Sequence, residues 1–233
     1  MSVSGNPDII TSGLILHLDA ADIKSYPRTG TVWYDRSGNG NNGTLVNGVG
    51  YSNGAMVFDG NTQYVDTNTV GNTAMTYGIW FYPLSFLTRP FGCGLFRIPS
   101  NISGVLGISV SGNFTYKVGS FSSGQEAYTS DTSDIVELNK WNCLYLTRDN
   151  LNISYFLNGR PILSKTQLTN YAYTTVLAGG STVGNIQGIG RGDINNDRGN
   201  FNGNISTVQI YNRALSQQEI LQNYNATKSR FQL

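Results

Sequence analysis

Side chains that could carry out acid–base or nucleophilic catalysis are few in this sequence and stand far apart. The chain has one histidine, His17, two cysteines, Cys93 and Cys143, and three glutamates that lie at least eleven residues from one another. A pair of carboxylates that cleaves a glycosidic bond would occupy alternate positions of one strand, where side chains share a face. A reactive thiol or hydroxyl would need a nearby base, and His17 is the only histidine. The sequence therefore predicts that the protein is not an enzyme.

Two tyrosines in a polar segment could instead bind a sugar. Tyr171 and Tyr173 stand two positions apart within residues 169–174, which read as a loop. A pyranose presents apolar C–H faces and a rim of hydroxyl groups, so a sugar site combines aromatic faces with amides and carboxylates. We predict that Tyr171 and Tyr173 contact a glycan. The alternative is that both rings are partly buried in loop packing or at an interface.

Oxygen-bearing side chains also gather in residues 193–199. Asp193, Asn195 and Asp197 have the spacing of the first three ligands of an EF-hand calcium loop. The glycine comes one place late, and no glutamate stands at position twelve, where an EF-hand supplies a bidentate ligand. A polar loop without a metal is the favoured interpretation of this segment.

The composition describes a folded but weakly charged chain of 233 residues, a length that suits one domain. Charged residues make up 12% of the chain, and the formal net charge is +1. A chain so close to neutral lacks the basic field that attracts nucleic acid or an anionic membrane. No run approaches 18 apolar residues, so we expect no membrane insertion. Residues 1–11 lack the basic and apolar regions of a secretory signal.

Short apolar runs punctuated by glycine predict an all-β fold. Six Asn-Gly steps occur, and this pair favours type I′ turns because both residues tolerate positive φ. In the first run, Leu14, Leu16 and Leu18 would share one face of a strand, and His17 would lie on the other. Such a density of turns favours a sandwich or a barrel. The expected strands span residues 14–18, 55–58, 63–66, 76–82, 105–110, 114–118, 141–147, 153–157, 160–163 and 204–211.

One helix is predicted near the C-terminus. Ser216 is a typical N-cap, and Glu219 three residues later completes a capping box. Leu215 before the cap and Ile220 inside the helix form a hydrophobic staple. The pattern predicts a short helix over residues 217–224 that closes an end of the sandwich.

Two runs are specific enough to suggest a family. The first is Asp-Arg-Ser-Gly-Asn-Gly-Asn-Asn-Gly over residues 35–43, and the second is Tyr-Asn-Arg-Ala-Leu-Ser over residues 211–216. With the strands around them, residues 13–224 resemble the concanavalin A-like lectin/glucanase superfamily in its laminin G-like jelly-roll branch. The resemblance implies an all-β sandwich of two antiparallel sheets, a jelly roll with a short C-terminal helix. The Asn-rich form is similar to versions found in structural proteins of tailed bacteriophages.

The resemblance also implies at most one bound Ca²⁺, held by loops at the rim of the sandwich. Asp35, Asn39 and Asn41 match the family loop, and Asp59 would lie nearby in the fold. Calcium prefers six to eight oxygen ligands from carboxylates, amides and carbonyls. The acidic residue that the family commonly carries before the last strand is replaced here by Ser206-Thr207. The alternative is a turn-rich loop whose Asp and Asn side chains bond their own backbone.

These observations divide the chain into an N-terminal arm, residues 1–11, and one jelly-roll domain, residues 12–233. The resemblance implies a non-enzymatic virion protein, such as a fibre, decoration or adhesin subunit, located on the particle and made in the host cytoplasm. Its partners would be neighbouring virion proteins and, as a further role, host-surface glycans. It would act as a homo-oligomer or in many copies on the particle. The alternative is a bacterial carbohydrate-binding module or lectin.

Overall fold

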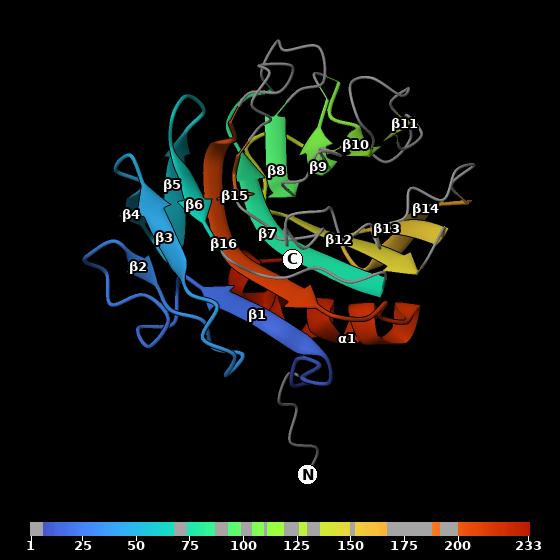
Figure 1. Ribbon diagram of the computed structural model, residues 1–233, viewed down its shortest axis with the longest axis horizontal. Coiled ribbons are helices and arrows are strands. Elements are labelled where there is room, and N and C mark those ends of the chain that lie inside the picture. Colours follow the sequence, from blue (N-terminus) through green and yellow to red (C-terminus); the bar gives the residue numbers. More distant parts are fainter. Residues whose placement is uncertain are drawn as a thin grey trace, which may run out of the picture.

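The computed structural model describes residues 7–67, 74–86, 93–98, 104–109, 111–118, 126–129, 136–149, 152–166, 188–191 and 200–233. These ranges contain sixteen strands, one α-helix and one 3₁₀-helix (Figure 1). None of their helices is long and apolar enough to cross a membrane. The elements are β1 (Leu14–Asp19), β2 (Val32–Trp33), β3 (Gly43–Val46), β4 (Gly50–Ser52), β5 (Ala55–Asp59), β6 (Tyr64–Asp66), β7 (Ala74–Pro83), β8 (Cys93–Ile98), β9 (Gly104–Ile108), β10 (Phe114–Val118), β11 (Glu126–Thr129), β12 (Asn142–Asp149), β13 (Asn152–Leu157), β14 (Arg160–Thr166), β15 (Gly188–Ile189), β16 (Asn202–Tyr211), α1 (Gln217–Thr227) and η1 (Lys228–Phe231).

The strands form two antiparallel sheets of eight strands each within the described ranges. The first sheet has the order β14-β13-β12-β7-β16-β5-β4, with β1 also paired to β16. The second has the order β11-β10-β9-β8-β15-β6-β3-β2. Pairing joins distant parts of the chain, since β16 lies between β7 and β5. The predicted two-sheet antiparallel sandwich is confirmed.

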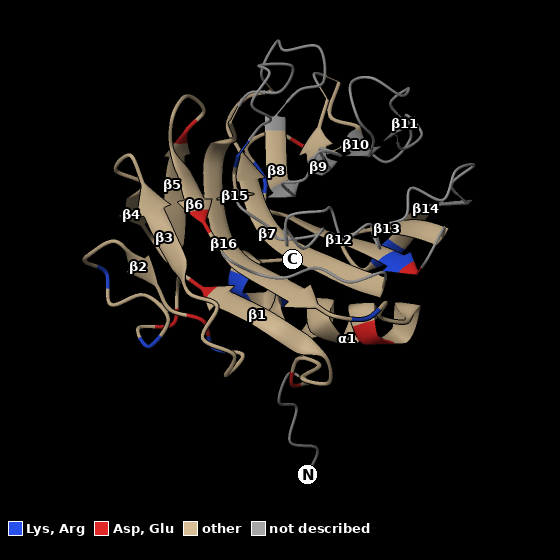
Figure 2. Ribbon diagram, viewed as in Figure 1, with Lys and Arg blue, Asp and Glu red and all other residues tan. Residues whose placement is uncertain are grey.

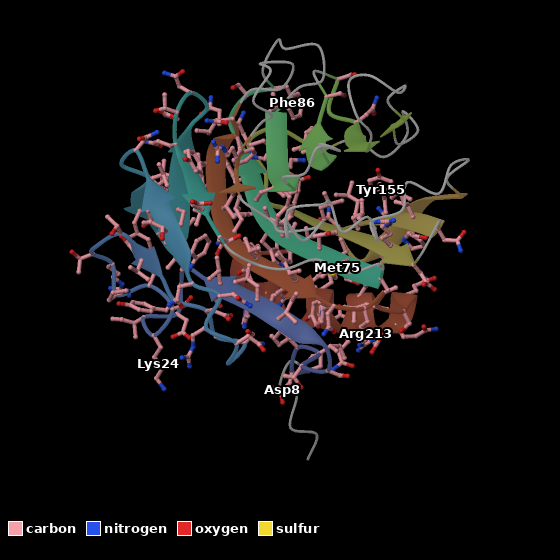
Figure 3. All side chains as sticks on the ribbon, in the orientation of Figure 1. Asp8, Lys24, Met75, Phe86, Tyr155 and Arg213 are labelled. Atoms are coloured by element: carbon pink, nitrogen blue, oxygen red, sulfur yellow. The ribbon has the colours of Figure 1, made fainter. Side chains whose placement is uncertain are left out.

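The main core lies between the two sheets. Leu16 and Leu18 of β1 and Phe96 of β8 are fully buried there, and Phe201 makes edge contacts with the rings of both Phe58 and Phe81. Met75 also lies inside this core (Figure 3). The central strands β7 and β16 carry no charged residue, and Figure 2 shows both in tan, with the charged residues on the loops and elements around them. Apolar burial on this scale is the main force that holds the sandwich together.

A second cluster lies on the outer face of the first sheet, beneath α1 and η1. Trp80 of β7 stacks on the rings of Tyr224 and Phe231, at centroid distances of 5.6 and 4.0 Å. Its indole N–H donates to the Thr227 hydroxyl at 2.9 Å. The central strands are therefore buried on both faces, which explains their continuous apolar runs. The helix covers a face of the sheet, which corrects the prediction that it closes an end of the sandwich.

The start of the helix confirms the predicted capping box. Ser216 accepts from the Glu219 backbone N–H at 3.3 Å, and the Glu219 carboxylate accepts from the Ser216 backbone N–H at 2.8 Å. Arg213 donates two hydrogen bonds to the same carboxylate and lowers the pKa of Glu219 to about 2. The helix runs to Thr227, three residues beyond the expected end.

A register shift in β1 corrects the prediction that three leucines share one face. Leu14 pairs with Tyr211, but Leu16 pairs with Ile210, so the strand carries a bulge between them. The extra residue turns the side chains before it toward the opposite face of the sheet. Leu14 therefore packs in the outer cluster under the helix, while Leu16 and Leu18 pack in the main core.

The described part of the predicted N-terminal arm lies against the C-terminal helix of the same chain. The Ile10 backbone N–H donates to the Asn223 side chain at 2.7 Å, and the Gln222 side chain donates to the Asp8 carbonyl at 2.8 Å. The Tyr211 hydroxyl donates to the Ile10 carbonyl at 3.0 Å. Residues 8–10 thus add to the cover over the first sheet.

Candidate functional site

A pocket of about 370 Å³ opens where the loop after β1 meets the turn between β4 and β5. Strand β4 is the edge of the first sheet within the described ranges, so the pocket lies at the rim of the sandwich. Its volume is within the range of small-molecule sites. The residues that line it are Ala21, Arg28, Tyr51, Asn53 and Gly54.

One wall of the pocket is the β4–β5 hairpin. Asn53 and Gly54 have φ values of 49° and 78°, as a type I′ turn requires. The Gly54 carbonyl accepts a hydrogen bond from the Ser206 hydroxyl at 2.8 Å, which ties the turn to β16. A Cβ at Gly54 would lie 3.1 Å from the Cβ of Ala21, so the glycine lets the two walls approach closely.

The opposite wall is the loop that joins β1 to β2, and Ser25 fixes its base. Ser25 is fully buried, and its hydroxyl accepts from the Asp19 backbone N–H at 3.0 Å and donates to the Tyr34 carbonyl at 2.6 Å. The Tyr34 backbone N–H donates to the Ser25 carbonyl at 2.7 Å. A loop held by three such bonds keeps its shape before any ligand arrives. Figure 3 shows Lys24, the residue before Ser25, pointing away from the body of the protein.

Tyr26 fixes the rest of this loop. The side chain is buried, its hydroxyl donates to the Gly30 carbonyl at 3.1 Å, and its ring lies 5.2 Å from the ring of Tyr51. Burial and the neighbouring Tyr51 raise the pKa of Tyr26, so the hydroxyl stays a donor at neutral pH. The contact between the Tyr26 and Tyr51 rings joins the loop after β1 to β4, and so links the two walls of the pocket.

Arg28 has an unusual backbone. Its φ of 66° places a long side chain in the left-handed region, which costs an L-residue about 1–2 kcal/mol. Within the described part of the chain, its guanidinium makes no hydrogen bond or ion pair, and neither the Tyr51 hydroxyl nor the Asn53 amide makes a hydrogen bond. The pocket therefore presents a cation, a phenol and an amide that are all free to bind.

The loop over residues 35–43 is different, because the Asp35 carboxylate is already saturated with hydrogen bonds. One oxygen accepts from the backbone N–H groups of His17 at 2.9 Å and Ser37 at 2.8 Å. The other accepts from the Ser37 hydroxyl at 2.7 Å and the Asn41 backbone N–H at 3.0 Å. Two acceptor positions on each oxygen are thus in use.

The two asparagines predicted as calcium ligands tie the loop to β1. The Asn39 amide N–H group donates to the Leu14 carbonyl at 3.1 Å, and that of Asn41 donates to the Ile15 carbonyl at 2.7 Å. The Asp35 carboxylate could bind a calcium ion only by giving up these hydrogen bonds. The bonds favour the turn-rich loop over a metal site, and calcium binding stays a prediction.

Asp59 does not join these residues, contrary to expectation. It pairs with Asn202 at the first position of β16, whereas His17 beside the Asp35 loop pairs with Gln209 near the last. Its carboxylate accepts from the backbone of residues 61–63. Desolvation opposes ionisation, but these bonds outweigh it and lower the pKa of Asp59. In the described residues, no three His, Cys, Asp or Glu side chains form a group that could hold a metal.

The predicted sugar contacts Tyr171 and Tyr173 lie outside the described residues, as do residues 193–199. The structure therefore leaves both expectations as predictions. Of the candidate nucleophiles, Cys143 is fully buried, and burial raises the pKa of its thiol. Burial also lowers the pKa of His17, although Asp19 and Asp35 nearby oppose the effect.

Sequence reasoning missed the pocket residues Arg28, Tyr51 and Asn53. Asn53 begins one of the six Asn-Gly steps, so the sequence predicts a turn there. It does not show which residues lie across the pocket from that turn. Arg28 follows Pro27 in a short polar stretch, and no local sequence pattern predicts a positive φ at an arginine.

A family model matches residues 59–221. The chain belongs to the concanavalin A-like lectin/glucanases superfamily. The match covers most of the two sheets and the start of the helix, but all five pocket residues precede it. Membership accounts for the fold and leaves the pocket to be understood from its own geometry. A search of curated protein sequences finds no match.

Solved structures share the fold at low sequence identity. Domain 4 of an extracellular arabinanase from Geobacillus stearothermophilus, in complex with arabinotriose, has a TM-score of 0.67 at 20% identity, with 91% of this chain and 98% of that chain covered. The binding domain of Paraclostridial Mosquitocidal Protein 1 has a TM-score of 0.66 at 15% identity, covering 92% and 52%. A botulinum neurotoxin type C structure described by its interaction with two ganglioside molecules has a TM-score of 0.65 at 14% identity, covering 93% and 52%. The chain thus spans about half the length of the two toxin chains.

Proposed function

We propose that this protein is a carbohydrate-binding domain and that the pocket at the β4–β5 turn is its sugar site. The observation that carries the proposal is the set of free polar groups in a fixed frame. The side chains of Arg28, Tyr51 and Asn53 line a pocket of about 370 Å³ and make no hydrogen bond or ion pair in the described chain, while Ser25 and Tyr26 hold the walls. A ring for C–H faces beside donors for hydroxyl groups suits a sugar.

The comparisons support this class of ligand. An arabinanase domain of similar fold was solved with arabinotriose, and a toxin of similar fold is described by its contact with gangliosides. Other structures with this fold belong to a sialidase of Trypanosoma rangeli, so the fold also occurs in chains of glycosidases. In the part of the chain that the structure describes, no carboxylate lines the pocket, and glycoside hydrolysis commonly needs two. Binding without cleavage is therefore the activity we propose.

The setting we propose is the surface of a virion, as the sequence resemblance to tailed-phage structural proteins suggests. There the domain would be held by neighbouring virion proteins, in several copies, with its sugar pocket turned toward a host-surface glycan. The alternative is a bacterial carbohydrate-binding module or lectin that works as a single copy. Light scattering of the purified protein separates these settings, since particle subunits occupy symmetric positions and favour a trimer or ring. A strict monomer would count against the virion setting.

The sugar site is tested on a microbial glycan array with a variant that fills the pocket. Ala21→Trp places an indole between the two walls and should reduce binding at least tenfold. Ile23→Trp is the matched control, because Ile23 lies on the same loop, is 59% exposed and does not line the pocket. Both variants should melt near the wild-type temperature. Equal binding by Ala21→Trp and wild type would remove the pocket from the proposal.

The amide can be tested without disturbing the turn. Asn53→Gly keeps a residue that tolerates positive φ in the hairpin and removes only the side chain. Binding should weaken several-fold, because about one net hydrogen bond is lost. An unchanged affinity would mean that Asn53 does not contact the sugar.

A further inference from the structure

Among the described residues, Arg28 is the only charged one that lines the pocket, and the acidic groups on its own loop are already engaged. Asp22 pairs with Arg36 at 3.2 Å. Asp19 accepts two hydrogen bonds from Arg230, at 2.7 and 2.8 Å. Neither aspartate is left to neutralise Arg28, whose guanidinium has no ion-pair partner in the described chain. The pocket therefore carries one uncompensated positive charge.

The backbone of Arg28 supports a role for this charge. Glycine would adopt a φ of 66° without strain, and Gly30 does adopt positive φ two residues later. A strained arginine at that place points to a function of its side chain, because such strain persists where the surroundings fix it and gathers at ligand sites. Tyr26 and its bond to Gly30 supply that fixing contact.

We infer that the natural ligand is a sugar that carries a carboxylate, and that Arg28 binds this group. The guanidinium is a planar fork that pairs with a carboxylate through two parallel N–H···O bonds. Tyr51 would take an apolar face of the ring, and Asn53 would bond to hydroxyl groups. This inference rests on the proposed sugar site and adds the chemical class of the sugar. Uronic acids and sialic acids both present the required group.

The test compares each acidic sugar with its carboxyl-reduced counterpart, which differs only in the loss of the anion. Calorimetric titration would use galacturonate oligomers, sialylated oligosaccharides, the reduced form of each, and a neutral arabino-oligosaccharide. We expect the wild type to bind at least one acidic sugar about tenfold or more tightly than its reduced form, as a charge-assisted pair predicts. Which acid is preferred identifies the source of the carboxylate.

Three variants test whether Arg28 causes the preference for the acidic sugar. Arg28→Gly removes the cation and suits the positive φ, so it should lose the preference for the acidic form and melt no lower than the wild type. Arg28→Lys keeps the charge without the fork and should keep only part of the preference. Lys24→Gln is the control, since Lys24 lies on the same loop, points away from the body of the protein and does not line the pocket, so its removal should leave the preference intact.

The outcomes separate this inference from the proposed function. Equal affinity of the wild type for acidic and reduced forms would overturn the inference while the sugar site stands. A preference that survives in Arg28→Gly would overturn the assignment of the carboxylate to Arg28. If the folded wild type binds none of these sugars, both the inference and the proposed function fail.

Discussion

The segment between β1 and β3 contains two neighbouring loops that treat their polar groups in opposite ways. In residues 35–43, both oxygens of Asp35 are saturated by donors of the same loop and of β1. In the loop that carries Arg28, the backbone is fixed, but the Arg28 guanidinium has no hydrogen-bond or ion-pair partner in the described chain. The first loop uses its polar groups to stabilise itself, whereas the second leaves Arg28 available for the proposed ligand.

The difference shows how motif and function can separate. The Asp35 loop is the more recognisable in sequence, and its oxygen-rich residues suggest a metal site. Its hydrogen bonds show that those residues build the loop itself, as side chains of Asp and Asn often do. The pocket has no recognisable motif, yet it combines free donors with a strained arginine. Solvent-facing polar groups without protein partners, held in a fixed frame, are therefore our guide to the proposed binding site.

The largest expected effect comes from removing the carboxylate of the saturated loop. Asp35→Ala leaves the N–H groups of His17, Ser37 and Asn41 without their acceptor and should lower the free energy of unfolding by about 3 kcal/mol. Urea denaturation of the two proteins measures the change. A loss below about 0.5 kcal/mol would show that the bonds of Asp35 add nothing net.

Asp35→Ala should also leave sugar affinity unchanged under conditions where the variant is folded, since Asp35 does not line the pocket. Titration below the melting temperature provides this control. A large loss of affinity in the folded variant would contradict the division of roles between the two loops.

Ser25 links the two regions, and its loss should affect both. Ser25→Ala removes the acceptor of the Asp19 N–H and the donor to the Tyr34 carbonyl in a fully buried place. We expect a loss of about 2 kcal/mol in the free energy of unfolding, because buried polar groups are left unpaired. Sugar binding should weaken as the pocket wall loosens. Stability loss with unchanged binding would show that the pocket does not depend on this link.

The sequence predicted the framework well because its signals are local. The Asn-Gly pairs that begin at Asn47, Asn53 and Asn158 form turns in which both residues have positive φ, and the capping box of the helix is complete within four residues. The bulge that moves Leu14 to the outer face has no such signal, because it depends on pairing with β16 far along the chain. The same holds for the site. Asp35 and Asp59 share a residue type but lie beside opposite ends of β16, and Arg28 and Asn53 come to line one pocket only after the sheets form.

A smaller effect is expected where a single hydrogen bond holds the pocket loop. Tyr26→Phe keeps the buried ring and its contact with Tyr51 but loses the bond to the Gly30 carbonyl. The free energy of unfolding should fall by about 1 kcal/mol, and sugar affinity should fall a few-fold because the position of Arg28 is less fixed. Thermal melting and titration measure the two effects. A variant that loses stability but keeps full affinity would show that Arg28 is placed by other contacts.

The smallest effect is expected from calcium. A ligand that binds only the folded state at 100 times its dissociation constant would add about 2.7 kcal/mol of stability, which thermal melting would detect easily. Because both oxygens of Asp35 already accept two hydrogen bonds and Asp59 lies at the other end of β16, we expect the same melting temperature in excess calcium and in excess chelator. A shift that disappears in Asp35→Asn would contradict this and place a metal in the saturated loop. A shift that survives Asp35→Asn would instead place the metal elsewhere in the chain.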